Sequence, residues 1–123
     1  IDAIDTVSAK IELAVRANAA GVPIISAMGA GNKLHPEMLE ISDLAKTEGC
    51  PLARVMRREL RARGILHMRV VYSKEAPLPP HADYAGDIHR IPEGKRQVPG
   101  SVSFVPSAAG LLLASEAVKL LLK

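Results

Sequence analysis

The chain has 123 residues, which is enough for one domain with a modest hydrophobic core. Hydrophobic residues make up 48% of it, which excludes a chain that is disordered by composition. The formal net charge of +3 is too small for a protein that coats nucleic acid through charge alone, although it is compatible with a local basic patch.

The residue types also indicate where in the cell the protein is expected. The single cysteine, Cys50, excludes an internal disulfide and favours a reducing compartment, for which we expect the cytoplasm. No signal peptide is visible. The most apolar run, residues 111–122, is interrupted by Glu116 and Lys119. It is shorter than the roughly 20 residues of a membrane span, so no contact with a membrane is expected.

The first residues predict the end of a buried parallel strand that passes directly into a helix. Alternating apolar residues stop at Asp5, and apolar residues at helical spacing then predict a helix over residues 6–20. Gly21 ends that helix, and residues 22–27 form a short buried strand. This strand–helix–strand order implies a right-handed crossover with parallel pairing. Ligands of such sheets bind at the carboxyl ends of the strands.

The rest of the chain predicts an α/β fold with mixed or antiparallel later strands. We expect strands at residues 38–42 and 68–73, with a helix over 51–63 between them. Residues 75–100 are rich in Pro and Gly, which predicts a long excursion or lid loop. A short strand over 101–105 and a strongly apolar final helix over 106–122 complete the prediction.

Asp5 has two compatible interpretations. An Asp at a helix start commonly accepts a backbone N–H and suits the positive end of the helix dipole. A carboxylate at the end of a strand can also hold Mg²⁺ beside nucleotide phosphates, because Mg²⁺ takes one or two carboxylates together with phosphate oxygens. The neighbouring Gly29-Ala30-Gly31 loop could cradle phosphate, but a tight turn is favoured because no helix follows directly.

The helix over 51–63 separates apolar residues from a basic face that includes Arg57. A solvated basic face is the default interpretation. The sharper hypothesis is that Arg54, Arg58 and Arg61 contact the phosphate backbone of a tRNA, since arginine pairs well with phosphate. No catalytic nucleophile or base is assigned, because no His lies near Cys50 and the four histidines lack metal-ligand spacing.

Several segments resemble the ThiF/HesA/MoeB family, the bacterial relatives of ubiquitin-activating enzymes. Residues 2–10, DAIDTVSAK, resemble its Asp-x-x-Asp-x-x-x-x-Lys/Arg segment, and residues 25–31, ISAMGAG, resemble the strand and loop that follow. Residues 35–37 (HPE), 41–47 (ISDLAKT) and 51–54 (PLAR), with the residues after them, narrow the resemblance to the branch of tRNA threonylcarbamoyladenosine dehydratase. Residues 99–106 and the apolar helix after them fit the same branch.

The resemblance implies a partial Rossmann-like sheet in an ATP-dependent enzyme that activates a carboxylate. In this branch the substrate is threonylcarbamoyladenosine in tRNA, which is closed to a cyclic form. The resemblance further implies ATP and Mg²⁺ as cofactors, tRNA as partner and a homodimer as assembly. Asp5 matches the family's aspartate at the nucleotide and metal. The catalytic residues stay unknown.

The departures from the family are as informative as the matches. Its Gly-rich nucleotide loop lies upstream of the matched segment, so we expect residues 1–123 to be a carboxyl-terminal portion of an adenylating domain that is inactive alone. Residues 96–100 contain no thiol, which leaves a thioester route unsupported. The alternatives are an adenylating enzyme for the tail of a sulfur-carrier protein and a non-catalytic dimerisation or docking module. Sulfur-carrier activators often carry paired Cys-x-x-Cys zinc motifs, which this chain lacks.

Overall fold

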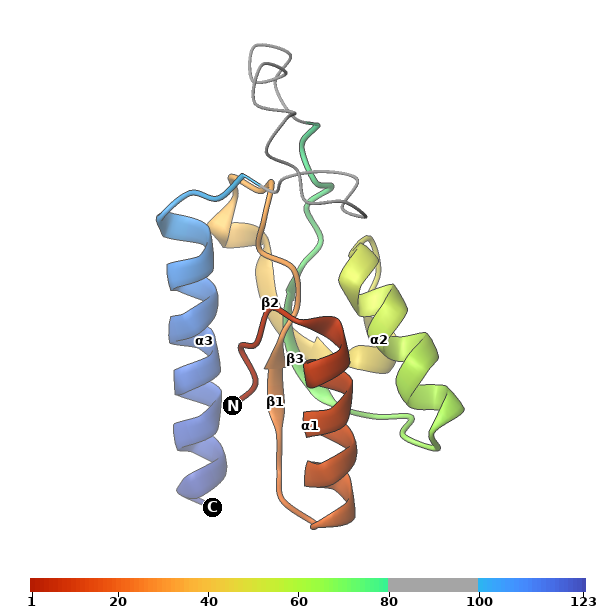
Figure 1. Ribbon diagram of the computed structural model, residues 1–123. Coiled ribbons are helices and arrows are strands. Elements are labelled where there is room, and N and C mark those ends of the chain that lie inside the picture. The colour runs from red at the N-terminus through yellow and green to blue at the C-terminus, as the bar shows by residue number, and fades with distance from the viewer. Residues whose placement is uncertain (80–99) are drawn as a thin grey trace.

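The computed structural model describes residues 1–79 and 100–123 as an α/β fold, which confirms the predicted class (Figure 1). The predicted loop over 75–100 lies largely outside the described residues. Two short 3₁₀ turns, η1 and η2, flank the second strand. In chain order the elements are α1 (Val7–Ala19), β1 (Ile25–Ala27), η1 (Pro36–Met38), β2 (Leu39–Asp43), η2 (Leu44–Lys46), α2 (Pro51–Ala62), β3 (Arg69–Ser73) and α3 (Phe104–Leu121).

The sheet is mixed, as the sequence predicts. Its order is β1-β3-β2, with β1 parallel and β2 antiparallel to β3. Asp2 adds an isolated parallel bridge to Ser26, so the first residues do pair in parallel with the strand that follows α1. That strand is shorter than predicted, because the N–H of Val22 donates to Ala17 O and so completes the turn that ends α1.

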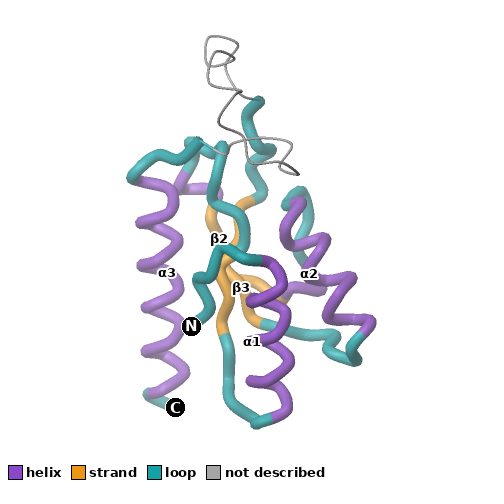
Figure 2. The backbone as a smooth tube through the Cα atoms, in the orientation of Figure 1, coloured by secondary structure: helices purple, strands orange, loops and turns teal. Residues whose placement is uncertain are grey.

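Helices cover both faces of the sheet, which gives the three layers seen in Figures 1 and 2. Alternate β3 residues point to opposite faces. Val70 and Tyr72 join a core with Met56 and Leu60 of α2 and Ala14 of α1. On the other face, α3 lies against the sheet through a smaller core of Ile25, Val71, Ala109 and Leu113.

The predicted strand over residues 101–105 is wrong, because α3 already begins at Phe104. Val105, Ala109 and Leu113 are buried at helical spacing, so helix formation seats Val105 on the sheet. Pro106 fits the first turn of this helix, where its missing N–H costs nothing.

The early start of α3 also removes the length argument against a membrane span. Among the described helices, α3 is long and apolar enough by length and composition to cross a membrane. In the fold its inner side lies on the sheet, where the buried Glu116 pairs with Arg69 at the start of β3. Its outer side is largely exposed, with Leu111 at 73% and Leu121 at 85% of their full exposure.

Candidate functional site

A buried charged cluster fixes the amino-terminal residues to the sheet. Asp2, Lys10 and Ser26 expose 0%, 1% and 0% of their surface. Lys10 Nζ lies 3.0 Å from Asp2 Oδ2, and Ser26 Oγ donates to the same oxygen at 2.5 Å. The other oxygen, Asp2 Oδ1, accepts the N–H of Ile4 at 3.0 Å. The cluster therefore joins the first residues of the chain to α1 and to β1.

Asp5 follows this cluster and is exposed at the start of α1. The interpretation of Asp5 as a helix cap is wrong: Thr6 occupies the N-cap position, and no side chain caps the helix. Because β1 and the Asp2 bridge are parallel, Asp5 lies at the carboxyl end of these strands. This leaves its carboxylate available to a ligand at the end of the sheet where such folds bind nucleotides.

The loop after β1 is held at the same end of the sheet. Gly29 and Gly31 have negative φ, and the left-handed residue of this loop is Asn32, with φ 57°. The N–H of Asn32 donates to Gly100 O at 2.8 Å, and its Oδ1 accepts the N–H of Gly100 at 2.7 Å. Asn32 O accepts the N–H of Leu78 at 2.7 Å. One residue thus holds the described chain on both sides of residues 80–99.

Glu75 continues the fixation of this loop beyond β3. Its carboxylate is buried and accepts the N–H groups of Leu34 and His35, both at 2.9 Å. Burial alone would raise the pKa of Glu75, but these N–H groups and the nearby Lys33 lower it below the usual value. Glu75 is therefore an ionised anchor for the loop, and Lys33, also buried, donates to Ser73 O at 3.4 Å beside it.

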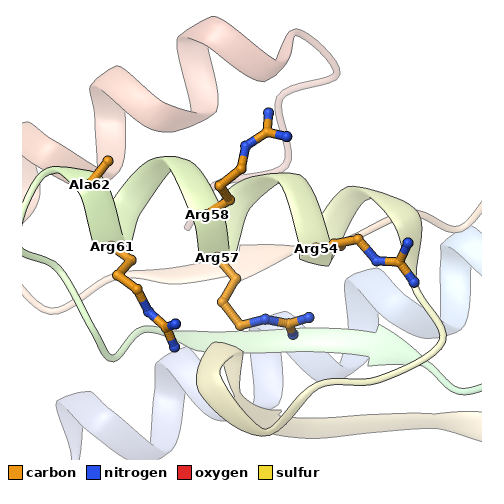
Figure 3. A pocket seen from close by; sticks show the side chains of 5 residues that line it. All are labelled: Arg54, Arg57, Arg58, Arg61 and Ala62. Atoms are coloured by element: carbon orange, nitrogen blue, oxygen red, sulfur yellow. The ribbon is translucent and has the colours of Figure 1, made fainter.

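The arginines of α2 divide into an anchor and a surface. Arg57 Nη1 donates to Thr47 O at 2.7 Å and to Thr47 Oγ1 at 2.6 Å, which ties α2 to the turn after β2. Arg54, Arg58 and Arg61 are exposed. All four line an open surface hollow of about 400 Å³ with Ala62 (Figure 3).

These arginines do not all point the same way. In Figure 3, Arg54, Arg57 and Arg61 leave α2 toward one side, and Arg58 leaves it toward the other. Arg58 also pairs with the neighbouring Glu59, with Nη2 and Oε1 2.9 Å apart. Arg54 and Arg61 therefore share a side of α2 with Arg57 between them, whereas Arg58 lines the same hollow from another side of the helix.

Two features of the site were not predicted from the sequence. The first is the role of Cys50, which is buried and is the N-cap of α2: its Sγ accepts the N–H of Ala53 at 3.5 Å. The second feature is the cluster of Asp2, Lys10 and Ser26. The signal for it in the sequence was that Lys10 lies four residues before the apolar Ala14 and so shares the inner side of α1 with it.

A magnesium ion fits this site only in part. No group of three or more His, Cys, Asp or Glu side chains gathers within residues 1–79 and 100–123. Asp5 is a single exposed carboxylate, so it would hold Mg²⁺ only together with phosphate oxygens of a nucleotide. That donor set is the usual one for Mg²⁺ at nucleotides.

Comparison with known proteins gives consistent matches, although no family model matches the chain. The chain is 39% identical to the tRNA threonylcarbamoyladenosine dehydratase of Bacillus subtilis over its whole length, which is 50% of that relative. Dehydratase 2 of Saccharomyces cerevisiae is 47% identical over 67% of the chain and 19% of its own length. The Escherichia coli dehydratase in complex with AMP has a TM-score of 0.76 at 27% identity, over 97% of the chain and 46% of that structure.

These relatives are dehydratases that act on a modified nucleoside of tRNA, and solved structures of one of them hold AMP or ATP. The chain is homologous to the tRNA threonylcarbamoyladenosine dehydratases and corresponds to the carboxyl-terminal part of them. It spans about half the length of the Bacillus subtilis relative.

Proposed function

We propose that the chain is the carboxyl-terminal part of an ATP-dependent tRNA threonylcarbamoyladenosine dehydratase. The observation that carries this proposal is the 39% identity to the Bacillus subtilis dehydratase across the whole chain. The likeness to the Escherichia coli enzyme, solved with ATP and with AMP, supports nucleotide binding by the same fold.

The proposed chemistry is activation of a carboxylate by adenylation. A carboxylate is a poor electrophile, so its oxygen first attacks the α-phosphorus of ATP and expels pyrophosphate. Ring closure by the carbamoyl group of the same nucleoside then expels AMP, with net loss of the elements of water. No residue of this chain is assigned as acid, base or nucleophile in these steps.

In this proposal Asp5 is the nucleotide and metal residue. Its carboxylate would hold Mg²⁺ together with phosphate oxygens, and the metal would neutralise charge on the phosphates. The position of Asp5 at the carboxyl ends of the parallel strands supports the role.

We further propose that the arginine surface, defined as Arg54, Arg58 and Arg61, contacts the tRNA backbone. Arginine pairs well with phosphate, and these three side chains are exposed.

The apolar outer side of α3 supports the proposal that the protein assembles as a homodimer. We also propose that the enzyme acts in the cytoplasm, because its single cysteine favours a reducing compartment.

The test is Asp5→Asn in the full-length protein, measured by ATP–pyrophosphate exchange in the presence of threonylcarbamoyladenosine tRNA. The variant keeps the shape of the side chain and loses its charge, so adenylation should fall at least about a hundredfold while the thermal melt stays unchanged. Glu12→Gln, on the exposed side of α1, is the matched control and should keep full activity.

Near-normal exchange by a folded Asp5→Asn would contradict the metal and nucleotide role. Exchange stimulated by the tail of a carrier protein, and not by the tRNA, would contradict the proposed substrate. The isolated 123 residues should show no exchange at all, and measurable turnover by them alone would contradict their proposed status as part of an enzyme.

A further inference from the structure

We propose that Asp2, Lys10 and Ser26 form a positioning cluster, which holds Asp5 in place at the end of the sheet. The inference rests on the proposed function of Asp5 and adds residues that act through it. None of the three is expected to touch the nucleotide, because all are buried.

The geometry shows a single carboxylate that joins three parts of the fold. Asp2 receives Lys10 from α1 and Ser26 from β1 on one oxygen, and the N–H of Ile4 on the other. Its backbone is fixed as well, since Asp2 N donates to Ile25 O and Ala27 N donates to Asp2 O, both at 2.8 Å. The segment that leads into Asp5 is thus fixed by its backbone and by its side chain.

The bond from Ile4 N–H to Asp2 Oδ1 sets the direction of the chain just before Asp5. An Asp side chain that accepts the N–H two residues on closes a local turn without help from a strand or helix. After Asp5, Thr6 begins the helix, and the N–H of Lys10 donates to Thr6 O at 3.0 Å. The backbone of Lys10 therefore continues the first turn of α1, while its side chain pairs with the carboxylate that closes the turn before it.

The charge of the cluster argues for a role beyond stability. Burying a paired Lys and Asp contributes little net stability, because desolvation offsets most of their attraction, and apolar residues of similar volume often serve a core as well or better. An ion pair with hydrogen bonds in fixed directions does define a geometry, which an apolar contact does not. We therefore infer that this cluster serves position.

The experiment compares variants of the full-length protein in three measurements: the thermal melt, the hydrogen exchange of the Ile4 amide, and the KM for ATP in pyrophosphate exchange. The main variant, Asp2→Leu with Lys10→Met, replaces the ion pair by apolar side chains. Ser26→Ala removes one hydrogen bond and leaves the ion pair, so it covers the case in which the double variant does not fold. Lys10→Arg keeps the charge.

The double variant should exchange the Ile4 amide about tenfold faster, because local opening is no longer opposed by the Asp2 side chain. Its KM for ATP should rise about tenfold, since small misplacements at an active site cost at least that much. Ser26→Ala should change both quantities in the same direction by about threefold, and Lys10→Arg, which keeps the ion pair with Asp2, should leave both near the parent values. The exposed pair Glu12 and Arg16, changed to Gln on the same helix, is the control without effect.

The proposal would be overturned if the double variant or Ser26→Ala folds and keeps the KM for ATP of the parent. That result would show a cluster with a structural role only, even if the thermal melt or the hydrogen exchange of the Ile4 amide changes. Failure of the proposed function is a separate result. If the proposed function fails, Asp5→Asn will keep full activity in pyrophosphate exchange. The hydrogen exchange of the Ile4 amide does not depend on that result, because it is measured without any substrate.

Discussion

Asn32 occupies the one left-handed position among the described non-glycine residues. Asn visits this conformation more readily than other residues with a Cβ, because its short amide can bond locally. Here the amide accepts the N–H of Gly100, 68 residues away. A Cβ on Gly100 would lie 3.4 Å from Asn32 Oδ1, at ordinary van der Waals distance, so this contact does not by itself require a glycine there.

Two substitutions at Asn32 should separate its backbone role from its side-chain role. Asn32→Gly keeps the left-handed conformation and loses the bond to Gly100, so it should cost about 1 kcal/mol of unfolding free energy. Asn32→Ala loses the bond and also forces a Cβ into this conformation, so it should cost roughly 2–3 kcal/mol. Urea unfolding measures both. Asn18→Ala, on the exposed side of α1, is the control, and equal losses for Gly and Ala would contradict the backbone role.

At the scale of elements, α2 shows how one helix divides similar side chains between structure and surface. Arg57 bonds to Thr47 O, Thr47 Oγ1 and Leu44 O, while Thr47 Oγ1 donates to Leu44 O at 2.8 Å. Asp43 Oδ1 accepts the N–H of Ala45 and starts the same turn. The ISDLAKT segment that resembles the dehydratases is therefore a structural link between β2 and α2.

The arginine surface should matter for tRNA and little for folding. Changing Arg54, Arg58 and Arg61 to Ala in the full-length protein should weaken tRNA binding. The slope of log affinity against log salt should also become shallower by about 1 for each phosphate that the protein no longer binds. Filter binding across a salt titration measures this. Arg58 should contribute least, because it pairs with Glu59 and points away from the other two (Figure 3).

The control for this surface is Arg16→Ala, an exposed arginine on α1 with an ordinary ion pair to Glu12. Arg57→Ala is expected to act differently, by lowering the melting temperature through the loss of its bonds to Thr47. Unchanged tRNA affinity of the triple variant at every salt concentration would return the arginine surface to ordinary solvated surface.

Periodicity in the sequence predicted α1, α2, β2 and β3 to within about two residues. The two helices each bury one face, whereas β3 buries four consecutive residues and β2 is half-buried throughout. Periodicity failed at residues 101–105. There Ser and Val alternate as in a strand, but the contact of Val105 with the sheet decides for a helix. A single sequence does not show which part of the fold an apolar residue will pack against.

The candidate site was predictable only in part. Asp5 came from its place after a strand end and from the family resemblance. The contact of Asp2 with Ser26 spans 24 residues and depends on the register of the parallel bridge, which periodicity does not define. The four arginines of α2 were visible in the sequence, but it did not show which of them is an anchor and which are surface residues. The partner of Arg57, Thr47, lies in a turn before α2.

At the scale of the whole molecule, the two faces of the sheet are covered unequally. The core under α1 and α2 is the larger, while within residues 1–79 and 100–123 α3 is the helix that covers the opposite face (Figure 2). The outer side of α3 exposes Leu111, Val118, Leu121 and Leu122. A contiguous exposed apolar surface of this kind usually marks a site of interaction with a protein or a membrane.

We therefore predict that the protein self-associates through the outer side of α3. Sedimentation velocity should show a dimer, and Leu111→Glu with Leu121→Glu should shift it to the monomer, because charges buried at an interface without partners are costly. The two leucines are 73% and 85% exposed, so the variant should keep its fold, as judged by an unchanged circular dichroism spectrum. Asn18→Glu, at an exposed polar position on α1 across the sheet from α3, is the control and should remain dimeric. Two results would contradict this prediction. A parent protein that sediments as a monomer at high concentration would show that α3 does not form a dimer interface. A parent protein that floats with lipid vesicles through α3 would show that a membrane covers this helix.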